Sequence, residues 1–152
     1  MSAFRRTGSV LAAALFGVSI LASNALAQSG SMAAATAPGL KWTPLVVPGF
    51  PAGAKMAVVH GNPGAAEDYV IRLRFPKGYA FPLHWHPGVE NLTVLTGVFH
   101  LGMEGEKKSK TYTAGDYLYI PGRMAHFGGA RTASTIQLHG VGPFAINLGS
   151  PK

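Results

Sequence analysis

Glycine and proline punctuate this sequence at close intervals, and this feature restricts the fold more than any other. The chain of 152 residues contains 20 Gly and 11 Pro, which separate short runs rich in Val, Leu, Ile, Thr and aromatic residues. One run alternates clearly: Ile71, Leu73 and Phe75 share a face, and the two arginines between them share the other. Because Gly and Pro are disfavoured inside helices, the sequence predicts an all-β fold of short strands joined by turns.

The same pattern predicts ten strands. We expect them at residues 56–60, 69–75, 80–86, 91–96, 98–103, 110–113, 117–120, 125–127, 132–139 and 144–148. No segment has a convincing amphipathic helical pattern, and no internal repeat is visible. Many short strands without helices are typical of a sandwich or barrel, and a single jelly-roll barrel fits best.

The first 27 residues have the pattern of a secretory signal peptide. Arg5 and Arg6 precede an apolar stretch at residues 10–22, and Ala-Leu-Ala follows at 25–27. We expect cleavage after Ala27, which would leave a periplasmic or secreted protein. The apolar stretch is shorter than the ~20 residues of a spanning helix, so no membrane attachment is expected after cleavage. The general secretory and twin-arginine routes both remain open.

The composition of the remaining chain excludes some chemistry. Residues 28–40 are small, polar or alanine-rich, which indicates a flexible leader, and we expect a single folded domain at residues 41–152. The chain has no cysteine, so disulfides and thiolate ligands are excluded. The one tight basic cluster, Lys107, Lys108 and Lys110, is best explained as a solvated hairpin loop, and nucleic-acid binding is not expected.

Two histidines with strand spacing carry the strongest chemical signal. His84 and His86 are at positions i and i+2 of the predicted strand 80–86, so both imidazoles lie on one face. Their Cα atoms would be ~6.6–6.8 Å apart, which lets both rings bind one ion. Trp85 then points to the opposite face, where a core or subunit-contact role is the simplest explanation.

The turns of the chain determine where two further polar residues lie. A Pro-Gly turn follows His86, so the chain can fold back and bring the carboxylate of Glu90 beside the two rings. His126 follows a turn, a strand and another turn, and is expected at the start of a later strand.

The segment that contains these residues resembles a known superfamily. Residues 78–97, GYAFPLHWHPGVENLTVLTG, match the first cupin motif, G-x5-H-x-H-x3-E-x6-G, at all five fixed positions. The second cupin motif, G-x5-P-x-G-x2-H-x3-N, is matched at Gly115, Pro121 and His126. The resemblance covers roughly residues 42–148.

The second motif departs from the cupin pattern at two positions. Arg123 replaces its second Gly, and Ala130 replaces its Asn. The loop before His126 is therefore expected to differ from the usual geometry, unless Gly122 serves the turn instead.

The resemblance implies a double-stranded β-helix barrel with one metal ion inside it. The residues that match the cupin ligands are His84, His86, Glu90 and His126. Cupins hold iron, manganese, nickel, cobalt or zinc at these positions, and three imidazoles with one carboxylate do not single out one metal. Cupins commonly dimerise, and the segment at residues 41–52 could supply a homodimer contact.

Three functions remain open, because the fold does not choose among them. The leading hypothesis is a metal-dependent enzyme, dioxygenase- or decarboxylase-like, that acts on a small organic molecule. The first alternative is a non-catalytic protein that binds a metal or a metabolite. The second is a lyase or isomerase that uses Glu90 as its base.

Three polar residues are candidates for supporting roles behind the metal ligands. His100 and His139 lie within or at the ends of predicted strands, where each could be a hydrogen-bonded residue, orient a ligand or shuttle protons. Gln137 shares a face with His139, and the pair would form the polar end of a substrate pocket if that face lined the barrel. His60 precedes a Gly-Asn-Pro-Gly turn and is most simply solvated.

Overall fold

The computed structural model describes residues 31–152, and the expected signal peptide lies outside the described residues. The part of the predicted leader that is described contains one short 3-10 helix, η1 (Ala37–Gly39), and no buried residue. Within residues 31–152, no helix has the length and apolar character needed to cross a membrane.

Eleven strands follow η1. They are β1 (Thr43–Pro44), β2 (Lys55–Gly61), β3 (Asp68–Phe75), β4 (Ala80–Trp85), β5 (Glu90–Thr96), β6 (Val98–Met103), β7 (Lys110–Thr113), β8 (Tyr117–Ile120), β9 (His126–Ala130), β10 (Ser134–Val141) and β11 (Asn147–Leu148).

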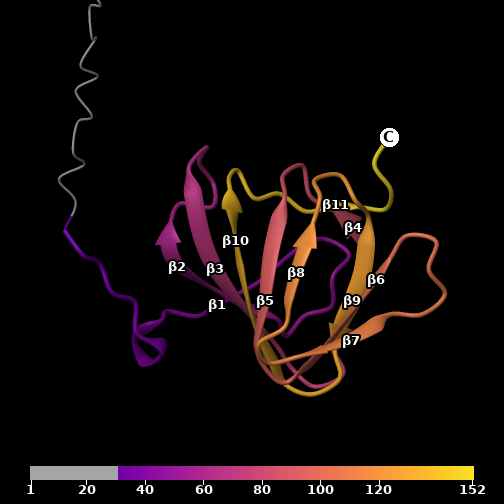
Figure 1. Ribbon diagram of the computed structural model, residues 1–152, viewed down its shortest axis with the longest axis horizontal. Helices are drawn as coiled ribbons and strands as arrows, with labels where there is room; N and C mark the ends of the chain where they lie inside the picture. Colours follow the sequence, from indigo (N-terminus) through magenta and orange to yellow (C-terminus); the bar gives the residue numbers. More distant parts are fainter. Residues whose placement is uncertain (1–30) are drawn as a thin grey trace, which may run out of the picture. The chain divides into compact units, whose positions relative to one another are not determined.

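These strands form two antiparallel sheets (Figure 1). The first has the order β1-β2-β3-β10-β5-β8, and the second has the order β11-β4-β9-β6-β7. Strands that are far apart in the sequence lie side by side, as β3 and β10 do over eight consecutive residue pairs. The sequence-based prediction of an all-β jelly roll is confirmed.

The core lies between the inner faces of the two sheets. Ile71 of β3 and Leu92 of β5 flank Leu138 of β10 across the first sheet, and all three are almost fully buried. Phe75 and Phe99 stack from opposite sheets with ring centroids 6.1 Å apart. The alternation seen in the sequence therefore places one face of each central strand inside the barrel.

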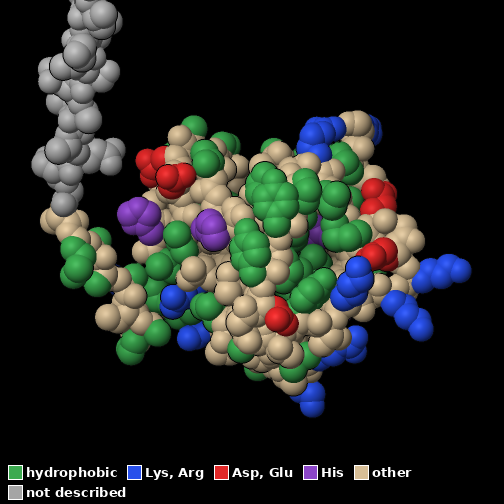
Figure 2. All heavy atoms as spheres, viewed as in Figure 1, with side chains coloured by type: hydrophobic (Ala, Val, Ile, Leu, Met, Phe, Trp, Pro, Cys, Tyr) green, Lys and Arg blue, Asp and Glu red, His purple; other side chains and the backbone are tan. Residues whose placement is uncertain are grey.

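The outer face of the first sheet remains partly apolar. Figure 2 shows hydrophobic side chains gathered over β5 and β8, and the outward residues of β8, Tyr117 and Tyr119, are 55% and 60% exposed. The lysine cluster lies in and beside the exposed connection of the β6–β7 hairpin, as the sequence indicated.

The prediction of a strand over residues 144–148 is wrong for its first three residues. The N–H of Phe144 donates to the carbonyl of Pro63, and the carbonyl of Ala145 accepts from the ring of His86. Because these backbone groups bond outside any sheet, only Asn147 and Leu148 pair with β4. The short strand β1 was not predicted.

Candidate metal centre

The second sheet supplies three histidines that face the barrel interior. His84 lies on β4, His86 follows directly after this strand, and His126 begins β9 and pairs with His84. All three are buried. Trp85, between the first two, is half-buried on the opposite side, so the predicted alternation is confirmed and Trp85 is not part of the core.

Glu90 reaches the same place from the other sheet. The turn at residues 87–89 carries the chain from β4 in the second sheet to β5 in the first, and Glu90 is the first residue of β5. Its side chain shares the inner face with Leu92 and is 4% exposed. The site is thus assembled from both sheets.

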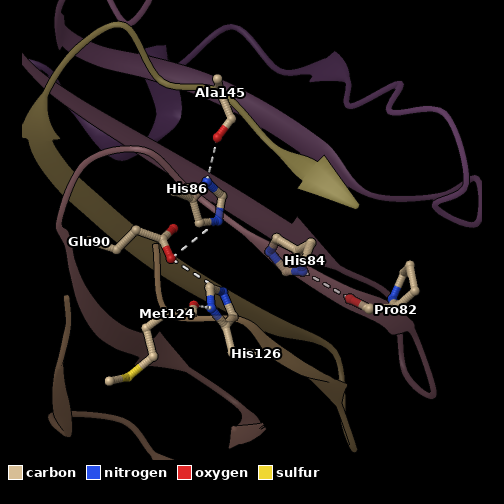
Figure 3. A network of polar contacts seen from close by, with 7 residues as sticks. All are labelled: Pro82, His84, His86, Glu90, Met124, His126 and Ala145. Carbon is tan, nitrogen blue, oxygen red and sulfur yellow. Dashed lines mark hydrogen bonds and ion pairs between the residues drawn. The ribbon is translucent and has the colours of Figure 1, made fainter. Parts of the chain in front are cut away.

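The four side chains converge on a small volume (Figure 3). One nitrogen from each histidine lies within 4.8 Å of the other two, so the three histidines can hold a metal ion. Oε2 of Glu90 lies 3.2 Å from Nε2 of His86 and 3.3 Å from Nε2 of His126. The structure therefore brings all four predicted ligands together.

Backbone carbonyls determine which nitrogen of each histidine faces the site. Nδ1 of His84 lies 2.9 Å from the carbonyl of Pro82, and Nδ1 of His126 lies 2.9 Å from that of Met124. Nδ1 of His86 lies 2.8 Å from the carbonyl of Ala145. A carbonyl only accepts, so each neutral ring carries its proton on Nδ1 and directs the lone pair of Nε2 inward.

Burial keeps these rings neutral. Burial and the neighbouring His126 lower the pKa of His84 to about 4. Burial, together with the electrostatic influence of His84 and His126, lowers the pKa of His86 to about 3. The pKa of His126 is also lowered by burial. Neutral imidazoles are the form that binds metal, so the histidines are ready for an ion at neutral pH.

Burial shifts the pKa of Glu90 in the opposite direction. Burial raises the pKa of Glu90 to about 8, so the metal-free protein keeps a proton there at neutral pH. Oε2 of Glu90 is buried and has no hydrogen-bond partner among the described residues. Ionised, this oxygen would face only the lone pairs of two imidazoles. A divalent cation between them would satisfy all three atoms, so the residues fit a metal.

The cavity beside the four side chains is small and otherwise apolar. Its volume is about 30 Å³, room for about two water-sized groups. Besides the four polar residues, its walls are Leu45, Phe50, Leu73, Phe75, Phe81, Leu92, Phe99, Leu101, Ile136, Leu138, Phe144 and Ile146. No wall residue offers a hydrogen bond from its side chain, so a bound molecule would find polar partners only at the metal centre.

Four wall residues lie outside the strands, where alternation along a strand cannot place them. Leu45, Phe50, Phe144 and Ile146 are only half-buried and lie on the segments that border the cavity outside the central strands. Phe50 meets the ring of His84 edge-on, with centroids 5.1 Å apart. No motif or spacing marks these residues, because they come from loops far from the histidines in the sequence.

The structure places none of the three supporting candidates in the cavity wall. Gln137 accepts a 3.0 Å hydrogen bond from Arg72 on the outer face of the first sheet, and His139 is exposed on that face. Gln137 and His139 therefore do not form the polar end of a substrate pocket, because Ile136 and Leu138 are the residues of β10 that face the barrel interior. Their apolar alternation in the sequence already favoured this orientation.

His100 also lies away from the centre. Its Nδ1 is 3.0 Å from the hydroxyl of Ser109, and burial together with the charge of Arg131 lowers its pKa. Ser109 belongs to the connection between β6 and β7, and His100 contacts none of the four candidate ligands through a hydrogen bond, so a role in orienting them is not supported. His60 is exposed, as the sequence indicated.

In the loop before His126, the position where the second cupin motif has glycine is occupied by Arg123, and no glycine takes over its backbone conformation. Arg123 itself adopts the left-handed backbone conformation, with φ 64°, at a cost of about 1–2 kcal/mol. Gly122 does not have this conformation, but glycine is needed there for packing, since a Cβ would lie 2.5 Å from the carbonyl of Pro87. The N–H of Arg123 donates to the carbonyl of His86 over 2.7 Å, which ties this loop to the ligand strand.

Comparisons with known proteins agree with this geometry. A family model described as a cupin domain matches residues 71–139, the range that holds all four candidate ligands. Among curated proteins, the sequence comparison finds no match.

Several solved structures have the same fold. A candidate acetylacetone dioxygenase from Methylibium petroleiphilum superposes with a TM-score of 0.63 at 19% identity, covering 83% of this chain and 86% of that one. An acetylacetone dioxygenase from Acinetobacter johnsonii gives 0.55 at 14% identity, covering 95% and 83%. The polyketide cyclase RemF from Streptomyces resistomycificus gives 0.69 at 15% identity, covering 80% and 88%. Identities this low establish the fold alone.

Proposed function

Since this chain belongs to the cupin superfamily, we propose that it is a metal-dependent, dioxygenase-like enzyme. The metal is one divalent transition ion held by His84, His86, Glu90 and His126. The substrate is a small, mainly apolar molecule that chelates the metal through two oxygen atoms, as a β-diketone does.

One observation carries this proposal. Three imidazole lone pairs and an unpartnered carboxylate oxygen point at one another inside a cavity whose other walls are apolar. In the metal-free protein the single proton on Glu90 cannot satisfy all of these acceptors, so a purely structural arrangement of this kind is costly in an apolar cavity. The position of Oε2 of Glu90, between His86 and His126, favours a ligand role over that of a free catalytic base.

The walls support a chelating substrate. Because no wall side chain beyond the four ligands can hydrogen-bond, the substrate's polar atoms must be held at the metal, and its apolar parts meet leucine, isoleucine and phenylalanine. When bound, a divalent metal polarises the oxygens of a chelating substrate and, as iron, provides a centre for dioxygen. The two similar folds named as acetylacetone dioxygenases support this substrate class.

The chain's own residues prepare the site for this chemistry. The carbonyls of Pro82, Ala145 and Met124 hold the imidazole rings in one tautomer. The carboxylate of Glu90 offsets part of the metal charge. The surrounding phenylalanines exclude water, which strengthens electrostatic interactions inside the cavity.

A second function is favoured by the size of the cavity. A volume of about 30 Å³ accepts a diketone only if half-buried wall side chains such as Phe50 and Ile146 move aside. A protein that retains a metal without turnover needs no such movement.

Oxygen uptake distinguishes the two functions. The purified protein is loaded with iron(II), and dioxygen consumption is followed with acetylacetone, with catechol and with acetate. We expect consumption with the diketone alone, and none with the metal-free protein or with His84→Ala. Stable retention of iron without oxygen uptake on any diketone would favour the non-catalytic function.

The cellular location and the assembly of the protein are also proposals. We infer from the signal-like pattern at residues 1–27 that the chain is exported to the periplasm or beyond and cleaved after Ala27. Mass spectrometry of the N-terminus of protein from the exported fraction tests this. A homodimer through residues 41–52 is tested by sedimentation: a monomer at high concentration would contradict it.

A further inference from the structure

Outside the barrel, a groove of about 640 Å³ lies next to the metal cavity. Ile146 lines both the cavity and the groove, so a single side chain forms part of the wall between them. The groove is also lined by Trp85, which turns its side chain away from the metal centre, and by Arg123. Its volume lies in the range of small-molecule sites.

The charged residues of the groove are all basic. Arg123 and Lys152 line it, and no Asp or Glu does. Within residues 31–152, no Asp or Glu forms an ion pair with Arg123. Its guanidinium lies over the ring of Trp85, 5.0 Å from the centroid, and donates to the backbone oxygen of Lys152. The Lys152 oxygen shows where the guanidinium of Arg123 can bind a hydrogen-bond acceptor.

Arg123 has a strained backbone conformation. The residue has φ 64°, a conformation that glycine adopts without penalty. The turn would therefore form more easily with glycine, which is also what the cupin motif has at this position. The contacts of the side chain with Trp85 and with the Lys152 oxygen offset part of this strain, and they hold the guanidinium at the groove.

We propose that the groove is a binding site for small organic carboxylates, with Arg123 as the residue that recognises the anion. The planar guanidinium can bind both oxygens of a ligand carboxylate, which gives two hydrogen bonds where the Lys152 oxygen accepts one. Ile146 and Leu148 contact the apolar part of the ligand, and the amide of Asn147 lies on the same wall. This site is separate from the four metal ligands and does not depend on the proposed reaction.

The substitution Arg123→Gly tests the proposal without disturbing the fold. It removes the guanidinium and relieves the left-handed strain, so its thermal unfolding midpoint should stay close to that of the wild type. Arg123→Lys keeps the charge but loses the planar fork that binds both carboxylate oxygens. Arg131→Ala removes one charge from an exposed position outside the groove and serves as the matched control.

The measurement is a titration of the full chain with benzoate, followed by the NMR shift of the Trp85 indole N–H. Benzamide has the same ring without the charge and is titrated in parallel. We expect saturable binding of benzoate, at least a tenfold loss of affinity in Arg123→Gly, a smaller loss in Arg123→Lys, and wild-type affinity in Arg131→Ala. Equal affinity of the wild type and Arg123→Gly, or equal binding of benzamide and benzoate, would overturn the proposal.

Discussion

Oε2 of Glu90 lies 3.2 Å from Nε2 of His86, although neither atom has a proton to share when the carboxyl is ionised. The ring proton of His86 is on Nδ1, which donates to the carbonyl of Ala145. The pair is therefore stable only with a positive charge between its members. In the metal-free protein this charge is the proton that the raised pKa of Glu90 retains, and in the proposed holoprotein it is the metal.

Loss of one imidazole should abolish metal retention. We expect His84→Ala to lower the affinity for zinc or iron(II) by at least ~100-fold, because His84 is one of three nitrogen ligands. Metal content after purification and dialysis measures this. His139→Ala removes an exposed histidine on the outer face and should retain the metal fully. Equal metal content in the two variants would contradict the site.

The stability of the metal-free protein should fall as the pH rises from 6.5 to 8. The folded protein holds a proton on Glu90, whose pKa is about 8, whereas the unfolded chain has released it above pH 4.5. Since the folded state then binds more protons, its free energy of unfolding decreases by up to about 1.4 kcal/mol per pH unit.

Glu90→Gln isolates this effect. The amide does not titrate, so urea unfolding of the metal-free variant should show a flatter pH dependence than the wild type over the same window. If both proteins show the same slope between pH 6.5 and 8, the raised pKa of Glu90 is not the cause.

Below pH 6.5, the buried histidines should make the free energy of unfolding decrease as the pH falls. Below pH 6.5 the unfolded chain binds a proton at His86, whereas in the folded state the pKa of His86 is about 3 and the ring stays neutral. The stability that its burial provides is therefore lost as the pH falls from 6.5 toward 3. Compared with wild type, metal-free His86→Gln should lose less stability between pH 6.5 and 5, by up to about 1.4 kcal/mol per pH unit. Urea titrations at fixed pH measure the difference, and parallel curves would count against it.

Two glycines of the first motif should differ in their tolerance of alanine. Gly78 and Gly97 have φ of 78° and 81°. A Cβ at Gly97 would lie 2.3 Å from the carbonyl of Ala133, whereas a Cβ at Gly78 would meet nothing within 4 Å. We expect Gly78→Ala to cost about 1–2 kcal/mol, and Gly97→Ala to cost about 3 kcal/mol or more because the backbone must also move. Denaturant unfolding of both variants tests this, and similar losses would refute the steric explanation.

Local properties of the chain made the fold and the ligands predictable. Strand alternation places residues i and i+2 on one face whatever the rest of the chain does, so spacing alone predicted that His84 and His86 share a face, and the structure confirms this. The glycines at positions 78 and 97 mark backbone conformations that other residues avoid. Glu90 and His126 needed the motif as well, because they reach the centre from another sheet and another strand.

The surroundings of the site could not be predicted in this way. The sequence does not show that Arg123 takes the left-handed position or that Gly122 packs closely against Pro87, because both depend on how the loop lies against residues 86–88. The cavity volume and the places of Phe50 and Ile146 in its wall depend on contacts between loops that are distant in the sequence.

The sequence by itself thus determined the all-β architecture and the four residues that can bind a metal, because both follow from short-range periodicity and backbone preference. Only the tertiary structure decided that the lone pairs of the three imidazoles and the carboxylate meet in one place and that the cavity is small and apolar. It also placed a basic groove behind Ile146. These properties come from the packing of side chains that the fold brings together from separate strands and loops, and no local pattern records which of them will meet.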